Sequence, residues 1–531
     1  MQGAPSVASS DATNVMALDV AELRSLVQSQ GETIAALRHQ LEWFRRQIFG
    51  PKSERFVPDA GSAQLSLDES LAGASAESAP AEPKKLIAPH TRRAAKRQAN
   101  AESGEELPFF DESKVPVQTI VLVPESVQGL SEEQYEVIGE KVSYRVAQRP
   151  GSYQVIKYIR RTVKLKATAE IQTVPAPDGI LGGSRADVSF AAGLLIDKFL
   201  WHLPLYRQHQ RIEAAGIQVS RPWLTQISQQ AIALLEPIYA AQWASIRTSR
   251  VKAMDETPIK AGKSGHGKMH TGYFWPVYGE QDEVCFPFHA SRAADFVSRA
   301  LGLTHEPGSV LLTDGYAAYE RYAKMSGVTH AQCWAHARRA IFEAEASAPA
   351  AVKDLLTHIQ RIYAVEDDIR AKGLAGEAKQ MYRLMHSQLL VDRLFAWIER
   401  YLAHHGLKPA TPFTKALAYV RERRAGLEVF LTDPDVPLDT NHLERALRVI
   451  PMGRKNWMFC WTELGARHVG IIQSLLVTCR LHGIDPTTYL IDVLQRVGEH
   501  PASRVAELTP RLWKSLFAAN PMRSELNDFP V

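Results

Sequence analysis

The chain has 531 residues, of which 45% are hydrophobic and 23% charged, and its formal net charge is +4. This length predicts several domains, and the composition is typical of globular proteins with sizeable cores. The small net charge does not by itself indicate nucleic-acid binding. The four cysteines lack CxxC spacing and the apolar runs are short, so we expect neither a disulfide framework nor a membrane span, and a cytoplasmic protein.

Residues 19–108 fall into two segments. From 19 to 49, apolar residues alternate at spacings of three and four, from Val20 and Leu23 to Phe44 and Ile48. This pattern predicts a coiled coil that joins copies of the chain, or else a helix that packs on its own protein. Residues 50–108 are rich in Ala, Ser, Pro and Glu, which predicts a disordered linker. Its basic cluster either contacts phosphates or is a solvated tail, and comprises Lys84, Lys85, Arg92, Arg93, Lys96 and Arg97.

Strands and then helices are predicted up to residue 245. Runs such as 119–123 and 153–159 predict a small β-rich module over 109–180. Residues 181–245 are predicted to be helical, with a helix to Ala215, a turn at Gly216, and a second helix capped by Ser220 with Pro222 in its first turn. This outline is typical of a helix-turn-helix DNA reader, although any helical hairpin can show it.

Two predicted strands in the next region each end in an aspartate. Strand 251–254 precedes Asp255, and strand 309–313 precedes Asp314. Carboxylates that lie close together repel each other unless a cation sits between them, and Mg²⁺ prefers such oxygen ligands. Glu444, on a predicted helix over 438–449, would complete a site for two ions that can support phosphoryl transfer.

Each of these carboxylates also has a simpler interpretation. Asp314 and Gly315 could form an ordinary turn. Asp255 and Glu256 could be exposed charges at a strand end. Asn441 and Glu444 fit a capping box at a helix start. Composition alone favours these alternatives, so the case for a site depends on context.

That context is a series of motifs along the chain. They are FGPKSER (49–55), HLPLYRQHQRIEAAGI (202–217), MDETP (254–258), TDGYAAY (313–319), CWAHARRAIFE (333–343), LDTNHLERALR (438–448), GRKNWMF (453–459) and SLLVTCRLHGIDPTTYL (474–490). In content and order they resemble the insertion-sequence-66 transposases, which are DDE-type enzymes with a ribonuclease-H-like catalytic core.

The resemblance implies a multidomain α/β protein: a coiled coil, a β-rich module, a helical DNA-binding region, and a ribonuclease-H-like core with a large helical insertion. The core would comprise 246–334 and 436–500, with the insertion at 335–435. Asp255, Asp314 and Glu444 would be the catalytic and metal-binding residues, with Mg²⁺ or Mn²⁺ as cofactor.

The implied reaction is metal-dependent cleavage at transposon ends and strand transfer into target DNA, in the bacterial cytoplasm at the nucleoid. The implied partners are double-stranded DNA, further copies of the chain and small accessory proteins of the same element, without a membrane. Two alternatives stay open: a catalytically silent DNA-binding protein or repressor derived from a transposase, and a nuclease without strand joining.

Further residues are assigned roles around this site. We expect DNA contacts from seven basic or aromatic residues: Arg207, Arg211, Arg445, Arg448, Arg454, Lys455 and Trp457. Core packing is the alternative for Trp457. Cys333 and His336 are expected to shape the site, and we expect no zinc there, because two ligands are not four.

The chain departs from the family at two places. Residues 109–175 lack the paired cysteines of the family's zinc-binding module, and Thr440 replaces the usual Asn. Without thiolates, either the module folds through its strands alone or DNA binding has moved elsewhere.

Overall fold

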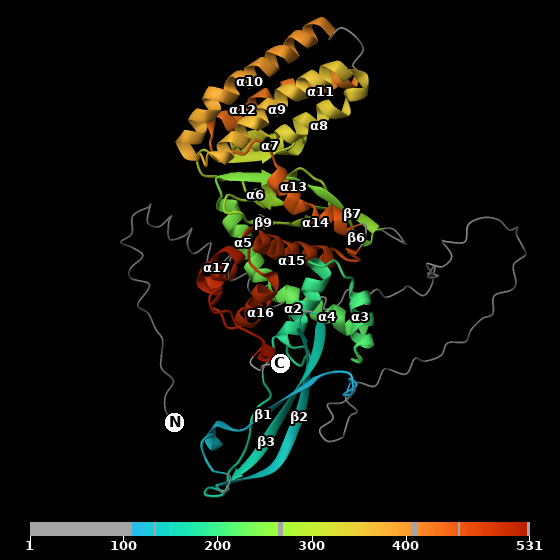
Figure 1. Ribbon diagram of the computed structural model, residues 1–531, viewed down its shortest axis with the longest axis vertical. Helices are drawn as coiled ribbons and strands as arrows, with labels where there is room; N and C mark the ends of the chain where they lie inside the picture. Colours follow the sequence, from blue (N-terminus) through green and yellow to red (C-terminus); the bar gives the residue numbers. More distant parts are fainter. Residues whose placement is uncertain are drawn as a thin grey trace, which may run out of the picture.

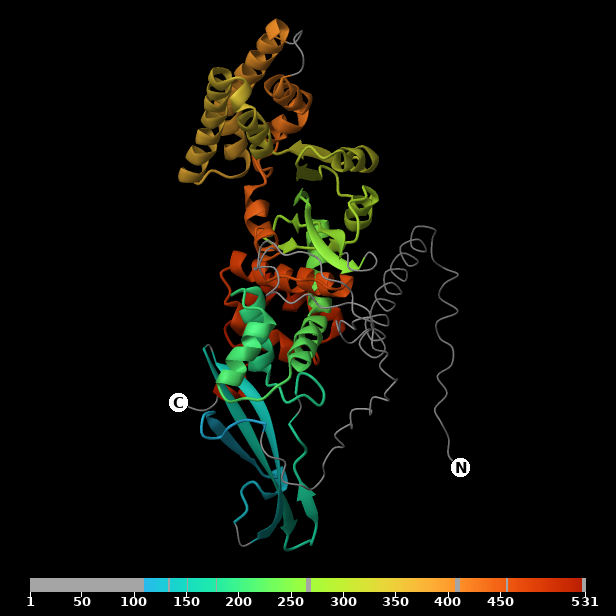
Figure 2. The same ribbon diagram turned by 90° about the vertical axis from the view of Figure 1, so that its right-hand side faces the viewer.

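The computed structural model describes residues 109–131, 134–149, 151–177, 179–263, 269–405, 411–454 and 457–527. The predicted coiled coil (19–49), the linker (50–108) and Lys455 lie outside the described residues. The described part is an elongated, mixed α/β structure. A β-sheet lies at one end, helices from residues 334–432 lie at the other, and a second sheet lies between them (Figures 1 and 2).

The terminal sheet is formed by β1 (Val117–Leu122), β2 (Tyr135–Arg149), β3 (Ser152–Leu165) and β4 (Ile171–Thr173). Its order is β1-β3-β2, with β4 on β3, and the long β2–β3 hairpin turns at Gly151, where φ is +83°. Buried Ala147, Ile156 and Tyr158 pack against Leu526 near the C-terminal end. The strands predicted in this region are thus confirmed, and they contain no cysteine.

Four helices follow: α2 (Val188–Phe199), α3 (Leu205–Ala214), α4 (Arg221–Leu234) and α5 (Glu236–Thr248). Gly216 adopts a φ of +91° between α3 and α4, a conformation that favours glycine. The Ser220 hydroxyl accepts a hydrogen bond from the Trp223 N–H at 3.3 Å, and Pro222 lies in the first turn. The predicted helix, turn and capped helix are confirmed as structure.

The central sheet has the order β12-β11-β5-β8-β9. Its strands are β5 (Val251–Met254), β8 (Val277–Tyr278), β9 (Val284–Cys285), β11 (Val310–Thr313) and β12 (Thr329–Gln332). The strands β5, β11 and β12 run parallel, whereas β8 is antiparallel to β5. All residues of β5 and β11 are buried, as expected for a sheet covered on both faces. A smaller sheet joins β6 (Thr257–Lys263), β7 (Met269–Phe274) and β10 (Phe288–His289).

Further helices lie around the central and the smaller sheet and continue toward the C-terminal end. They are α6 (Asp295–Leu301), α7 (Ala317–Ser326), α13 (Asn441–Leu447), α14 (Val449–Gly453), α15 (Glu463–Leu481), α16 (Pro486–Arg496) and α17 (Pro510–Leu516). In α15, Gly470 allows a close approach, because an added Cβ would lie 2.3 Å from the Phe286 carbonyl oxygen. No helix among the described residues is long and apolar enough to cross a membrane.

The helical end consists of α8 (Trp334–Glu343), α9 (Pro349–Ala371), α10 (Gly376–His405), α11 (Pro412–Glu422) and α12 (Arg424–Thr432). The helices predicted in this region are therefore present. Arg383 of α10 is 0% exposed and bonds both carboxylate oxygens of Glu366 at 2.8 Å. It also donates to the carbonyls of Phe430 and Val436. This arginine therefore holds the segment through which the chain returns toward α13.

Candidate active site

Asp255 and Asp314 follow directly after two adjacent parallel strands. Leu312 of β11 is paired with Ala253 of β5, so each aspartate lies two residues beyond a paired position. Side chains at these positions meet at the carboxyl edge of the sheet, where ligand sites of open α/β sheets are found. The structure thus brings the two predicted carboxylates together.

Contacts of Cys333 hold the helix that carries Glu444 beside the same edge of the sheet. The Cys333 N–H donates to the Thr313 carbonyl at 3.0 Å. Its sulfur accepts hydrogen bonds from the backbone N–H of Thr440 at 3.3 Å and from the Thr440 hydroxyl at 3.2 Å. Cys333 therefore connects the strand before Asp314 to the start of α13, the helix that carries Glu444. Burial raises the pKa of this thiol, which fits a hydrogen-bonded neutral sulfur.

The Glu444 carboxylate faces two basic residues of α8. His336 Nε2 lies 3.8 Å from its Oε1, and Arg339 Nη2 lies 3.6 Å from its Oε2. The buried Oε1 has no hydrogen-bond partner among the described residues. The capping-box alternative is wrong, because the Thr440 N–H is used by Cys333 and Asn441 donates to Asp439 instead. Glu444 thus keeps an oxygen available for a ligand.

The electrostatic field of the three carboxylates converges on Asp255. Burial raises the pKa of Asp255 to about 7, and the negative charges of Glu256, Asp314 and Glu444 act in the same direction. The Glu256 N–H, which donates to Asp255 Oδ1 at 2.7 Å, opposes them. A cation would relieve this repulsion. Within the described ranges, however, no three His, Cys, Asp or Glu side chains are clustered tightly enough to hold a metal ion unaided.

The alternative that Glu256 is an exposed charge at the strand end is wrong. Its side chain is only 4% exposed. Its Oε1 accepts a hydrogen bond from Arg292 Nε at 3.0 Å, and its Oε2 accepts one from the Tyr319 hydroxyl at 2.5 Å. Because these partners occupy both oxygens, Glu256 stabilises the site, and Asp255 is the carboxylate of this pair that can bind a ligand.

The turn after Asp314 is also held by neighbours. Asp314 Oδ1 accepts a hydrogen bond from the Tyr316 N–H at 2.9 Å, so the turn interpretation of this residue is partly correct. The Arg292 guanidinium lies 4.1 Å from the centre of the Tyr316 ring. One oxygen of Asp314 therefore shapes the loop, while the other is not engaged in this turn.

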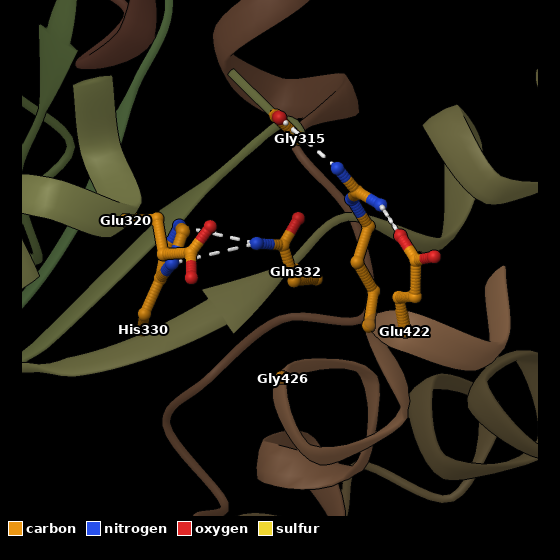
Figure 3. Close-up of a pocket in the computed structure, with 7 residues that line it drawn as sticks. Gly315, Glu320, His330, Gln332, Glu422 and Gly426 are labelled. Carbon is orange, nitrogen blue, oxygen red and sulfur yellow. Dashed lines mark hydrogen bonds and ion pairs between the residues drawn. The ribbon is translucent and has the colours of Figure 1, made fainter. Parts of the chain in front are cut away.

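A cavity of about 280 Å³ lies beside this turn (Figure 3). Arg423, at the start of α12, donates to the Gly315 carbonyl at 3.2 Å and stacks 3.8 Å from the centre of the Tyr419 ring. An added Cβ on Gly315 would lie 2.5 Å from Arg423 Nε, so glycine is needed for this approach. Arg423 cannot be predicted from the sequence, because 108 residues separate it from Gly315 and no local pattern marks it.

The predicted DNA-contacting residues fall into two groups. Arg207, Arg445 and Arg448 are exposed. Arg211, in contrast, bonds the Tyr153 hydroxyl at 2.8 Å and forms an ion pair with Asp197.

Two further residues of this set lie after α14. Arg454 donates to the Pro258 carbonyl at 2.6 Å. Trp457 is 2% exposed and stacks on His202 at 4.8 Å between ring centres. This placement favours core packing, the alternative given for Trp457 above.

Family models and similar proteins together cover most of the chain. The family model described as "Transposase IS66 family" matches residues 183–468, which is more than half of the chain. Models described as "IS66 C-terminal element" and "Transposase C of IS166 homeodomain" match residues 474–511 and 36–108. Two similar proteins of Sinorhizobium fredii, the uncharacterized proteins y4hP and y4qI, are each 28% identical to this chain. The first alignment covers 92% of this chain and 90% of the relative, and the second covers 93% and 92%. The chain therefore belongs to the IS66 family of transposases.

Proposed function

We propose that this chain is a DDE-type transposase that cuts DNA at transposon ends and joins the freed 3′ end to target DNA, with Asp255, Asp314 and Glu444 as its catalytic carboxylates. The observation that carries the proposal is the convergence of these three residues. Two of them follow adjacent parallel strands, and burial together with the charges of Asp314 and Glu444 raises the pKa of Asp255.

The residues fit divalent cations of the Mg²⁺ or Mn²⁺ type. Such cations take one or two carboxylates together with substrate phosphates and water, so a closed protein shell is not required. When bound, they would supply charge stabilisation for the phosphoryl group and a more acidic attacking hydroxyl. Asp255 and Asp314 would hold them at the sheet edge, and the partnerless oxygen of Glu444 would complete the site.

The remaining side chains of the site have orienting roles. His336 and Arg339 approach Glu444 from α8, and Cys333 fixes the start of its helix through Thr440. Arg292 and Tyr319 occupy Glu256 and so hold the strand end beside Asp255. These contacts support a preorganised site on rigid elements, which phosphoryl transfer requires.

Two wider features support the same proposal. The mixed five-stranded sheet supports the proposal of a ribonuclease-H-like core, and the helices α8 to α12, which lie in the chain between β12 and Glu444, support that of a helical insertion. Exposed Arg445 and Arg448 continue α13 beyond Glu444 and would contact DNA phosphates. Arg207 on α3 would do so in the helix-turn-helix region.

Two assays separate the proposal from its alternatives. Calorimetric titration with Mn²⁺ in the presence of end DNA should show binding that Asp255→Asn abolishes. A catalytically silent DNA-binding protein would bind the DNA without this metal effect. Incubating a pre-cut 3′ end with target DNA should yield a joined product, whereas a nuclease without strand transfer would yield none.

A further inference from the structure

Two exposed aromatic residues lie close to the strand that leaves the carboxylate site. Phe459 is 61% exposed and Trp461 is 53% exposed. Between them, Cys460 is buried, forms a parallel bridge with Ala261 of β6, and accepts a hydrogen bond from the Gly262 N–H at 3.2 Å. Cys460 is thus a buried residue between two rings that are exposed on either side of it along the chain.

This aromatic pair, Phe459 and Trp461, is tied to the active-site strand. The β6 strand begins two residues after Asp255. Arg454 donates to the carbonyl of Pro258 at 2.6 Å, and Cys460 is bridged to Ala261. Arg454 and Cys460 thus contact Pro258 and Ala261, in the same order along β6. DNA held at Asp255 would meet this segment next.

The charges around the aromatic pair favour a polyanion. Lys260 is exposed on β6, on the outward side opposite to buried Ile259 and Ala261. Arg467 is exposed one turn into α15, and Glu463 is the exposed acid on the same stretch of that helix. Arg454 adds a further cation. The described cations of this face thus outnumber its acid, which is the balance that attracts a phosphate backbone.

We propose that Phe459 and Trp461 form a stacking surface for unpaired DNA bases beside the carboxylate site. Exposed aromatic rings flanked by cations bind single strands, because every base has a face that can stack. Bases inside a duplex are already stacked on each other, so the ligand class is unpaired nucleotides at a frayed or opened end. The inference rests on the proposed function for the presence of DNA at this edge.

The test is binding of a labelled oligothymidine by the full chain without divalent cation, measured by fluorescence anisotropy. Trp461→Ala and Phe459→Ala should each weaken binding by about 5- to 150-fold, the range measured for one stacked base. Binding of a duplex of equal length should change less than about 2-fold, because its phosphate contacts remain. Trp461→Phe should retain most of the affinity. Phe342→Ala, which removes a ring 51% exposed on α8, serves as the matched control.

An abasic oligonucleotide tests the proposal on the unaltered protein. It keeps the phosphates but has no bases to stack on either ring, so it should bind at least as weakly as oligothymidine binds Trp461→Ala. Unchanged binding in both alanine variants, or equal losses for single strand and duplex, would overturn the proposal. So would a change in self-association without a change in DNA binding, which would mark a protein contact. Because no metal is present, a failure of the carboxylate assignment would not alter these results.

Discussion

Removing the charge of Asp255 should stabilise the metal-free protein. Burial and three neighbouring carboxylates raise the pKa of this residue from 3.8 to about 7. A carboxyl whose pKa is raised in the folded state favours folding when protonated, and this contribution is lost as the pH rises from about 4 through about 7. At pH 8 the ionised Asp255 therefore destabilises the fold, by no more than about 4 kcal/mol.

Asp255→Asn keeps the acceptor for the Glu256 N–H and removes the charge. Its melting temperature in a chelator at pH 8 should exceed that of the wild type by several degrees, and the gain should shrink at pH 5. Asp368→Asn, which changes an exposed carboxylate on α9, should leave the melting temperature nearly unchanged. Added Mg²⁺ should stabilise the wild type more than Asp255→Asn, because only the intact site gains binding free energy.

Equal melting temperatures for wild type and Asp255→Asn at pH 8 would refute this reasoning, and a lower one for the variant would refute it more strongly. Either result would mean that the three carboxylates do not strain one another in the folded chain. The case for a cation between them would then lose its electrostatic basis.

Two further substitutions test how the site is supported. Gly470→Ala places a Cβ 2.3 Å from the Phe286 carbonyl, which is backbone and cannot rotate away, so thermal unfolding should show a loss of about 1–3 kcal/mol. Gly498→Ala has no neighbour within 4 Å of its added Cβ and should be tolerated; equal effects would disprove the packing argument. Arg383→Met leaves Glu366 without its buried partner and should cost about 3–5 kcal/mol in chemical denaturation. An effect below about 1 kcal/mol would show that this ion pair does not hold the helical end.

Many strands and helices can be predicted from the sequence, because they depend on residues that are close together along the chain. The strands before Asp255 and Asp314 were predicted as apolar runs that end in a carboxylate, and both exist. The cap at Ser220 follows from residue types within one turn. In contrast, β12 (Thr329–Gln332) was not predicted, because its sequence THAQ is not an apolar run and it depends on pairing with β11.

The contacts around the carboxylates are harder to predict from the sequence, because they join residues that are far apart along the chain. Glu256 seemed free to be exposed, because its partners Arg292 and Tyr319 come from later segments. The bond between Cys333 and Thr440 spans 107 residues, and no spacing rule predicts it. Trp457 and Trp461 are four residues apart, yet one is buried and the other exposed. Trp457 is buried because it packs against Phe199 and His202, which lie far away in the sequence.

The most direct test of the proposed chemistry is a strand-transfer assay with purified protein, Mg²⁺ or Mn²⁺, and DNA that carries the element's own ends. Wild type would be compared with Glu444→Gln, and with Glu343→Gln of α8 as a matched glutamate control. We predict a metal-dependent joined product from wild type and from the control, and none from Glu444→Gln although it still binds the ends. Joined product that persists in Glu444→Gln would contradict the assignment of the third carboxylate. No product from wild type with intact end binding would favour a silent DNA-binding protein.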